Sequence, residues 1–230
     1  AAFQAAFAKE IGAETMVQVN ICDNNPRMWA DMVRYTNIER NYDFKYWELG
    51  NEVSLTNCIS PSEYANRFVR YEQALKAVDP SIKVIGPVTH QPYKTEWYDA
   101  LVSRTGNNLD GLVWHWYQLT NWSSDRSSFA YQGGSVEALL NYNEGVGTAC
   151  HEGFGCPGDD ISMSRLDRMT YRRGLADAMM RYVKDRFKRN NPDLETALTE
   201  FGPHASRHED PITANHIAAI WLADLLGRWA

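Results

Sequence analysis

The chain has 230 residues, of which 44% are hydrophobic, and its formal charge is −6 at pH 7. This length and apolar content allow one sizeable core and predict a single domain. The acidic balance, with no basic block, argues against a nucleic-acid partner. No apolar run approaches the roughly 18 residues of a membrane span, so we expect no membrane partner either.

The first part of the chain alternates helical and strand-like segments. Residues 1–11 carry apolar side chains at helical spacing before Gly12. Residues 15–20 are nearly continuously apolar, which predicts a parallel strand buried on both faces. A helix is expected from Asn25 and Pro26 to about residue 37. Residues 46–52, Tyr-Trp-Glu-Leu-Gly-Asn-Glu, then predict a second buried strand that ends on a carboxylate.

The same alternation continues through the rest of the chain. Ser60 and Pro61 predict the start of a helix that runs to about residue 78. A strand at 82–87 and a helix at 95–105 follow, and the strand predicted at 109–118 places His115 and Tyr117 on one side. The last predicted elements are a helix at 163–188, a strand at 196–200 and a helix at 212–229.

Repeated strand and helix pairs predict a parallel α/β architecture with right-handed crossovers. A complete (β/α)8 barrel usually needs about 250 residues. With five convincing strands, we expect an incomplete (β/α)8 TIM barrel that forms a single catalytic domain over residues 1–230. It carries a long loop insertion at about 119–162, and loops of this length at the catalytic end of a barrel commonly shape the substrate cleft.

Glu52 and Glu200 each stand at the end of a predicted strand. The carboxyl ends of barrel strands form the face that carries the chemistry. Two carboxylates there suggest glycoside hydrolysis, with one as acid/base and the other as a nucleophile or a base that activates water. A structural carboxylate after a strand is the alternative for each. Glu48 shares the side of Glu52 by strand alternation and is expected deeper in the barrel as a buried hydrogen-bonding partner.

Three segments in this order resemble the clan A glycoside hydrolases: residues 46–52, Trp-His-Trp-Tyr at 114–117 and Thr-Glu-Phe-Gly at 199–202. Enzymes of this clan are retaining (β/α)8 barrels with Asn-Glu after strand four and a glutamate after strand seven. The similarity is greatest to arabinofuranosidase-type families such as family 51, and to family 39. It implies that the visible strands are three to seven. The missing barrel strands are then expected from sequence outside these residues or from another chain.

The resemblance also implies roles for individual residues. Glu52 is the expected general acid/base and Glu200 the expected nucleophile. Asn51 is expected to hydrogen-bond the sugar 2-hydroxyl, while Tyr117 of the element His115-Trp116-Tyr117 holds the nucleophile ionised and oriented. Taken alone, an asparagine in this position is a turn residue and the tyrosine is a barrel-rim aromatic. Weaker candidates for substrate binding are Gln18, Asn20, His90, Trp114, Trp116 and Trp122.

The acid/base role sets a requirement on the surroundings of Glu52. A general acid must be protonated at working pH, so its pKa has to be raised by a partly apolar site or by a nearby negative charge. Tyr46, Trp47 and the second carboxylate are expected to supply these conditions.

Four cysteines form an even set. Cys22 and Cys58 follow neighbouring predicted strands, so a disulfide between their loops is expected, and Cys150 and Cys156 enclose a short loop that contains glycine. Both pairings fit an oxidising compartment and a secreted or extracellular protein. Four free thiols in a cytosolic enzyme are the alternative.

No metal site is expected. The sequence has no C-x-x-C pair, and the spacing of the polar residues after the last predicted strand matches no known ligand pattern. Those residues are His204, His208, Glu209 and Asp210.

The expected function is retaining hydrolysis of a cell-wall-type polysaccharide by double displacement, with either an arabinofuranosidase-like or an endo-β-glycanase specificity. An oligo- or polysaccharide is the expected partner, and neither a metal nor an organic cofactor is required. The alternative is a catalytically inactive glycoside-hydrolase-like barrel that serves as a carbohydrate-binding or structural extracellular protein.

Overall fold

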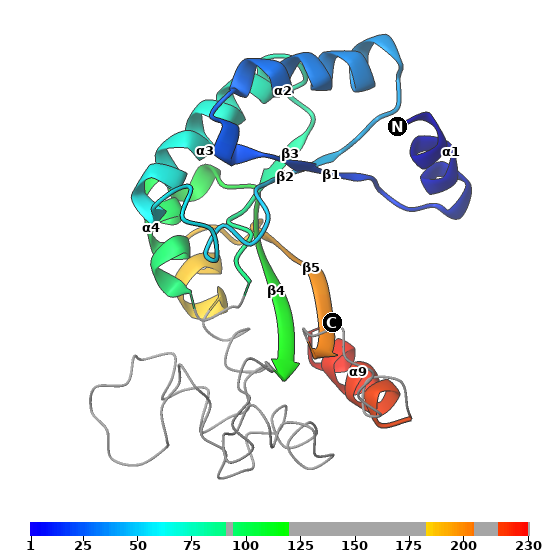
Figure 1. Ribbon diagram of the computed structural model, residues 1–230, viewed down its shortest axis with the longest axis vertical. Coiled ribbons are helices and arrows are strands. Elements are labelled where there is room, and N and C mark those ends of the chain that lie inside the picture. Colours follow the sequence, from blue (N-terminus) through cyan, green and yellow to red (C-terminus); the bar gives the residue numbers. More distant parts are fainter. Residues whose placement is uncertain (91–93, 120–182, 205–215, 230) are drawn as a thin grey trace. The chain divides into compact units, whose positions relative to one another are not determined.

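The computed structural model describes residues 1–90, 94–119, 183–204 and 216–229 (Figure 1). The chain divides into two units, described separately below: residues 1–115 with 190–199, and residues 116–189 with 200–230. The predicted loop at 119–162 lies almost wholly outside the described residues, as do most of the predicted helix 163–188 and the pair Cys150 and Cys156.

A sheet with parallel pairing forms the centre of the first unit. Its strand order β1-β2-β3-β4-β5 follows the order of the sequence. Strand β1 pairs in parallel with β2, β2 with β3, and β3 with β4. The backbone N–H of Glu195 donates to the carbonyl of Asp110 at 2.9 Å, where β5 begins. The strands are β1 (Met16–Val19), β2 (Tyr46–Leu49), β3 (Lys83–Ile85), β4 (Gly111–Leu119) and β5 (Glu195–His204).

Helices separate the strands, as the parallel architecture requires. Figure 1 shows α2, α3 and α4 along one side of strands β1 to β3. None of the helices in the described residues is both long and apolar enough to cross a membrane. The helices are α1 (Ala2–Ile11), α2 (Pro26–Val33), α3 (Pro61–Lys76), α4 (Thr95–Thr105) and, in the second unit, α9 (His216–Trp229). Short 3₁₀ or π-helical segments are η1 (Ile21–Asp23), η2 (Arg34–Glu39), η3 (Gly106–Asn108) and η4 (Lys184–Lys188).

Local capping explains where these helices begin. The side chain of Asn25 accepts a hydrogen bond from the backbone N–H of Met28, and Ser60 does the same for Glu63. In both helices a proline occupies the first turn, where its missing N–H costs nothing. The helix starts at Pro26 and Pro61 are therefore confirmed.

The helical side of the sheet is closely packed. Trp47 and Leu49 of β2 are fully buried, as are Tyr64 and Phe68 of α3. The hydroxyl of Tyr64 donates to the carbonyl of Leu49 at 2.7 Å, which joins the helix to the end of the strand. Burial of these large side chains contributes about 1.5–3 kcal/mol each and fixes where β2 ends.

The opposite side of the sheet is more open at β1. Met16 is 38% exposed and Gln18 is also exposed, so the prediction that this strand is buried on both faces is wrong. The physical reason is its place in the sheet, because β2 is its one neighbouring strand among the described residues. Met16 and Tyr46, which pair across β1 and β2, line a cavity of about 150 Å³ together with Ile85 and Ala197.

Charged side chains join the starts of the later strands. Asp110 accepts from Lys76 Nζ at 2.7 Å and from the backbone N–H of Val84 at 2.8 Å. The hydroxyl of Tyr46 donates to Glu195 Oε2 at 2.9 Å, and Lys83 Nζ lies 3.8 Å from Oε1 of the same residue. This network lies at the opposite end of β2 from Glu52.

Gly12 and Gly50 both adopt backbone conformations that other residues rarely take. Gly12 ends α1 with φ 69°, and a Cβ added there would have no atom within 4 Å. Gly50 follows β2 with φ 106°, and an added Cβ would lie 2.5 Å from Cγ1 of Val53. Gly50 is therefore required for both its backbone angle and its lack of a side chain.

We predict that Gly50→Ala destabilises the protein much more than Gly12→Ala does. The cost at Gly12 is the left-handed conformation alone, about 1 kcal/mol. At Gly50 the strain and the overpacking against Val53 together cost about 3 kcal/mol or more. Chemical denaturation of the two variants measures the difference in the free energy of unfolding, and equal losses would contradict the prediction.

Candidate active site

Glu52 lies in a turn rather than in the strand. Strand β2 ends at Leu49, and the turn is held by two backbone hydrogen bonds, from Gly50 N to Val19 O at 2.8 Å and from Val53 N to Val88 O at 3.0 Å. Glu52 itself has φ 45°, a left-handed conformation that is uncommon for glutamate. Strand alternation therefore does not relate it to Glu48, and that part of the prediction is wrong, although Glu48 is buried as expected.

The carboxylate of Glu52 contacts a buried histidine. Its Oε1 lies 3.0 Å from Nδ1 of His115, which is fully buried in β4. The backbone N–H of His115 donates to the carbonyl of Thr89 at 2.9 Å, which fixes the backbone that carries the ring. The structure thus brings together two residues that lie 63 positions apart in the sequence and were both predicted for the site.

These contacts lower the pKa of Glu52. The largest cause is the hydrogen bond with His115, burial acts in the opposite direction, and the charges of His115 and His90 add smaller lowering effects. The direction is opposite to the raised pKa that a general acid needs. Tyr46 and Trp47 do not supply it as predicted, because Tyr46 donates to Glu195 and Trp47 Nε1 donates to the carbonyl of Phe44 at 3.1 Å.

His90 lies beside the same turn. Its Nδ1 is 2.7 Å from Oγ of Ser54, and the same hydroxyl accepts from the backbone N–H of His90 at 3.1 Å. Burial, followed by the positive charge of Lys94, lowers the pKa of His90 to about 4, so the ring is neutral at pH 7. Sequence reasoning found His90 but missed Ser54, because a serine two residues after Glu52 carries no distinctive signal.

Asn51 and Asn20 have different partners. Asn51 Oδ1 accepts from Gln18 Nε2 at 2.9 Å, which links the turn after β2 to β1. The side chain of Asn20 accepts from the backbone N–H of Cys22 at 3.0 Å and caps η1. Asn20 therefore has a local structural role, and its contact with a substrate stays a prediction.

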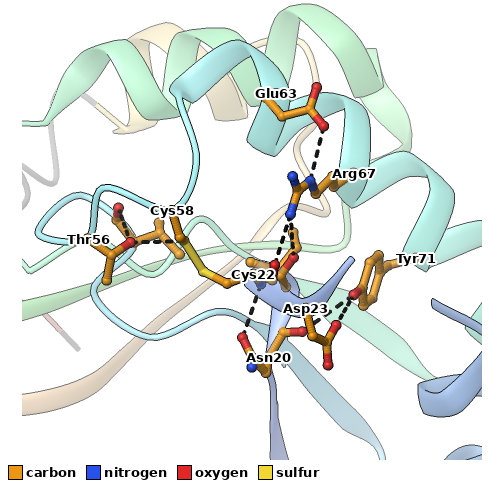
Figure 2. Close-up of a disulfide and its surroundings, with 10 residues drawn as sticks. Asn20, Cys22, Asp23, Thr56, Cys58, Glu63, Arg67 and Tyr71 are labelled. Atoms are coloured by element: carbon orange, nitrogen blue, oxygen red, sulfur yellow. Dashed lines mark hydrogen bonds and ion pairs between the residues drawn. A yellow bond between two sulfur atoms is a disulfide. The ribbon is translucent and has the colours of Figure 1, made fainter. Parts of the chain in front are cut away.

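A disulfide joins the segments that follow β1 and β2 (Figure 2). Cys22 and Cys58 are bonded, with their Cα atoms 5.9 Å apart, which confirms this predicted pairing. Arg67 of α3 donates to the carbonyls of Ile21 at 3.2 Å and Cys22 at 3.1 Å. It also forms an ion pair with Glu63 at 3.0 Å. The segment after β1 is therefore anchored both to the turn that carries Glu52 and to α3.

Three further predicted site residues belong to the second unit. Glu200 is partly buried in β5, and Trp116 is buried in β4. Tyr117 follows in β4, where only its backbone is described. The pairing of Glu200 with Glu52 stays a prediction. Of the polar residues that follow the last predicted strand, His204 ends β5, and His208, Glu209 and Asp210 lie outside the described residues.

Comparisons with known proteins bear on the family and the fold of this chain. A family model described as the alpha-L-arabinofuranosidase 1 domain matches residues 4–131, more than half of the 230 residues. An intracellular exo-alpha-L-arabinofuranosidase of Bacteroides ovatus is 29% identical over 102 residues, which are 43% of this chain and 20% of that protein. Alpha-L-arabinofuranosidase C of Emericella nidulans is 33% identical over 89 residues, 37% of this chain and 18% of that protein.

The matched segments thus span about a fifth of the length of these curated relatives. Among solved structures, the GH51 arabinofuranosidase from Xanthomonas axonopodis pv. citri is similar with a TM-score of 0.60 at 14% identity. The alignment covers 98% of this chain and 45% of that one. At this identity the likeness concerns the fold alone, and it confirms the predicted incomplete (β/α)8 barrel.

We predict that His115→Phe raises the pKa of Glu52. The variant removes the hydrogen bond that lowers this pKa most and keeps the burial that raises it. In the wild type, the ionised Glu52 contributes stability above the ordinary carboxyl pKa, and this contribution is lost as pH falls through the lowered folded value. The pKa is measured by NMR titration of 13C-labelled glutamate carboxyl groups, with the signal assigned by its loss in Glu52→Gln.

The matched control is His90→Phe. The charge of His90 is the last of the causes that act on Glu52, so this variant should raise the pKa of Glu52 less than His115→Phe does. A fall in this pKa in His115→Phe, or a larger rise in His90→Phe, would contradict the electrostatic account of the site.

Proposed function

Because the chain belongs to the alpha-L-arabinofuranosidase 1 domain family, we propose that it forms the catalytic region of a retaining O-glycoside hydrolase. The proposed substrate is a cell-wall-type polysaccharide, from which arabinofuranosyl groups are released. The observation that carries the proposal is the placement of Asn51 and Glu52 directly beyond a central strand, with Glu52 hydrogen-bonded to the buried His115.

The proposed reaction has two displacement steps. In the first, Glu200 attacks the anomeric carbon, the bond to the glycosidic oxygen breaks, and Glu52 gives its proton to that oxygen. A covalent glycosyl-enzyme remains. In the second, Glu52 takes a proton from water as the water attacks the same carbon and frees Glu200. Asn51 donates a hydrogen bond to the sugar 2-hydroxyl, and Tyr117 keeps Glu200 ionised.

The lowered pKa of Glu52 affects the two steps of the proposed reaction differently. The first step needs Glu52 protonated, while the hydrogen bond with His115 favours the ionised form. We propose that a bound substrate raises the pKa of Glu52 by excluding water, and that the negative charge of Glu200 acts in the same direction. After the first step Glu200 is no longer charged, so the hydrogen bond with His115 favours the ionised Glu52 that accepts a proton from water.

We predict distinct defects for the two glutamates in the full-length protein. Glu52→Ala loses about 10²–10⁴-fold in activity on a substrate with a poor leaving group, because general acid catalysis is removed. Azide then restores turnover of an activated aryl arabinofuranoside and gives a glycosyl azide of retained configuration. Glu200→Ala with azide gives the inverted product, since azide replaces the nucleophile.

Proton NMR of the reaction mixture identifies the configuration of both the sugar and the azide products. The exposed Glu39 provides a matched control, because Glu39→Ala removes a carboxylate at the end of η2, before β2 begins, that has no part in the proposed reaction. Inverted sugar from the wild type would contradict the retaining mechanism. Substrate binding without turnover would instead favour an inactive carbohydrate-binding barrel.

We also propose that the protein is secreted or extracellular. The Cys22–Cys58 disulfide supports this location, because such bonds persist in oxidising compartments. Peptide mass mapping of the protein from its own cells, without and with reduction, should give a peptide pair linked through these cysteines only before reduction. Two free thiols at these positions would contradict the proposed location.

A further inference from the structure

The side chain of Gln18 in β1 is hydrogen-bonded to Asn51, the residue that precedes the proposed acid/base Glu52. Its Nε2 donates to Oδ1 of Asn51 at 2.9 Å. In the sheet Gln18 pairs with Glu48, so it lies level with the last part of β2, just before the turn begins. Sequence reasoning gave Gln18 only as a weak candidate for a sugar contact, whereas its contact in the structure is with another side chain of the site.

The direction of this hydrogen bond fixes which end of the Asn51 amide faces away from β1. A primary amide has one oxygen that accepts and one nitrogen that carries two donor hydrogens. Since Oδ1 of Asn51 accepts from Gln18, the oxygen is turned toward β1 and the nitrogen is turned away from it. Asn51 is thereby held as a hydrogen-bond donor toward the side of the turn that does not face Gln18.

Backbone and covalent links keep β1 and the turn in register around this contact. Val19 follows Gln18 in β1, and its carbonyl accepts a hydrogen bond from the backbone N–H of Gly50 at 2.8 Å. Cys22, four residues after Gln18, forms a disulfide with Cys58. Figure 2 also shows Arg67 of α3, which donates to the carbonyl of Cys22. The Gln18 contact is therefore followed along the chain by two other connections of the same segments, at Val19 and at Cys22, so the strand that carries Gln18 is held in place beside Asn51.

We propose that Gln18 is a positioning residue that orients the Asn51 amide so that its nitrogen donates to the 2-hydroxyl oxygen of the sugar bound beside Glu52. This inference rests on the proposed function and deepens it. It makes recognition of the 2-hydroxyl depend on the polarity of a side chain on β1 that does not itself touch the sugar.

Two variants of similar size separate polarity from simple loss of contact. In Gln18→Glu the carboxylate can only accept, so it attracts the Asn51 nitrogen and turns the amide oxygen toward the substrate. In Gln18→Met no hydrogen bond is made, and the Asn51 amide is free to take either orientation. We expect kcat/KM for an arabinofuranoside to fall about tenfold in Gln18→Met and about a hundredfold in Gln18→Glu.

The same assays on the 2-deoxy analogue test whether the effect passes through the hydroxyl. Both variants should lie within about twofold of the wild type there, because Asn51 has no sugar hydroxyl left to contact. Asn51→Ala should show the same dependence on the 2-hydroxyl. Losses that persist on the 2-deoxy analogue, or equal losses in Gln18→Met and Gln18→Glu, would overturn the proposed role of Gln18.

Failure of the proposed function gives a different result. If the wild-type full-length protein turns over neither substrate, the hydrolase proposal fails. The role of Gln18 is then tested by calorimetric binding of arabinose and of 2-deoxy-arabinose to the same variants. The polarity effect is expected in the Kd for arabinose alone, and equal weakening for both sugars would overturn it.

Discussion

The turn that presents Glu52 depends on one backbone constraint, the positive φ of Gly50 directly after β2. This angle lets the chain leave the strand sharply while Gly50 N still donates to Val19 of the neighbouring strand. The space that a side chain would need is filled by Val53, which is itself buried. The position of Glu52 is thus set by packing beneath the turn as well as by the strand before it.

The surroundings of Glu52 combine opposing electrostatic effects. Burial disfavours its charge, and the hydrogen bond with His115 favours it more strongly. His90 stands nearby as a neutral ring because burial and Lys94 hold its pKa down. A carboxyl group in this balance responds readily to a change in its contacts, which suits the acid/base role proposed for Glu52.

Much of the fold follows from signals that are local in the sequence. The caps at Asn25 and Ser60, with the prolines after them, set the helix starts because the relevant hydrogen bonds span only three residues. The disulfide of Cys22 with Cys58 was predictable because parallel strands bring the segments after them to the same edge of the sheet.

Other features depend on contacts that no local pattern carries. The exposure of Met16 results from the position of β1 in the sheet, which its apolar sequence does not reveal. The left-handed backbone of Glu52 is uncommon for this residue type, so the apolar run before it suggested a continuous strand instead. Tyr46 was assigned to the surroundings of Glu52, whereas its hydroxyl reaches Glu195, 149 residues away in the sequence.

The disulfide also determines how the protein would respond to a break in its backbone. Cys22 and Cys58 close a ring of chain that contains α2 and the whole of β2. The segment around Asn41 and Asp43 lies inside this ring, and both residues are exposed there. A protease that cut the chain once at this segment would leave α1 and β1 covalently attached to the rest of the protein. Two fragments would separate only after reduction, although the native sheet could persist in the cleaved form.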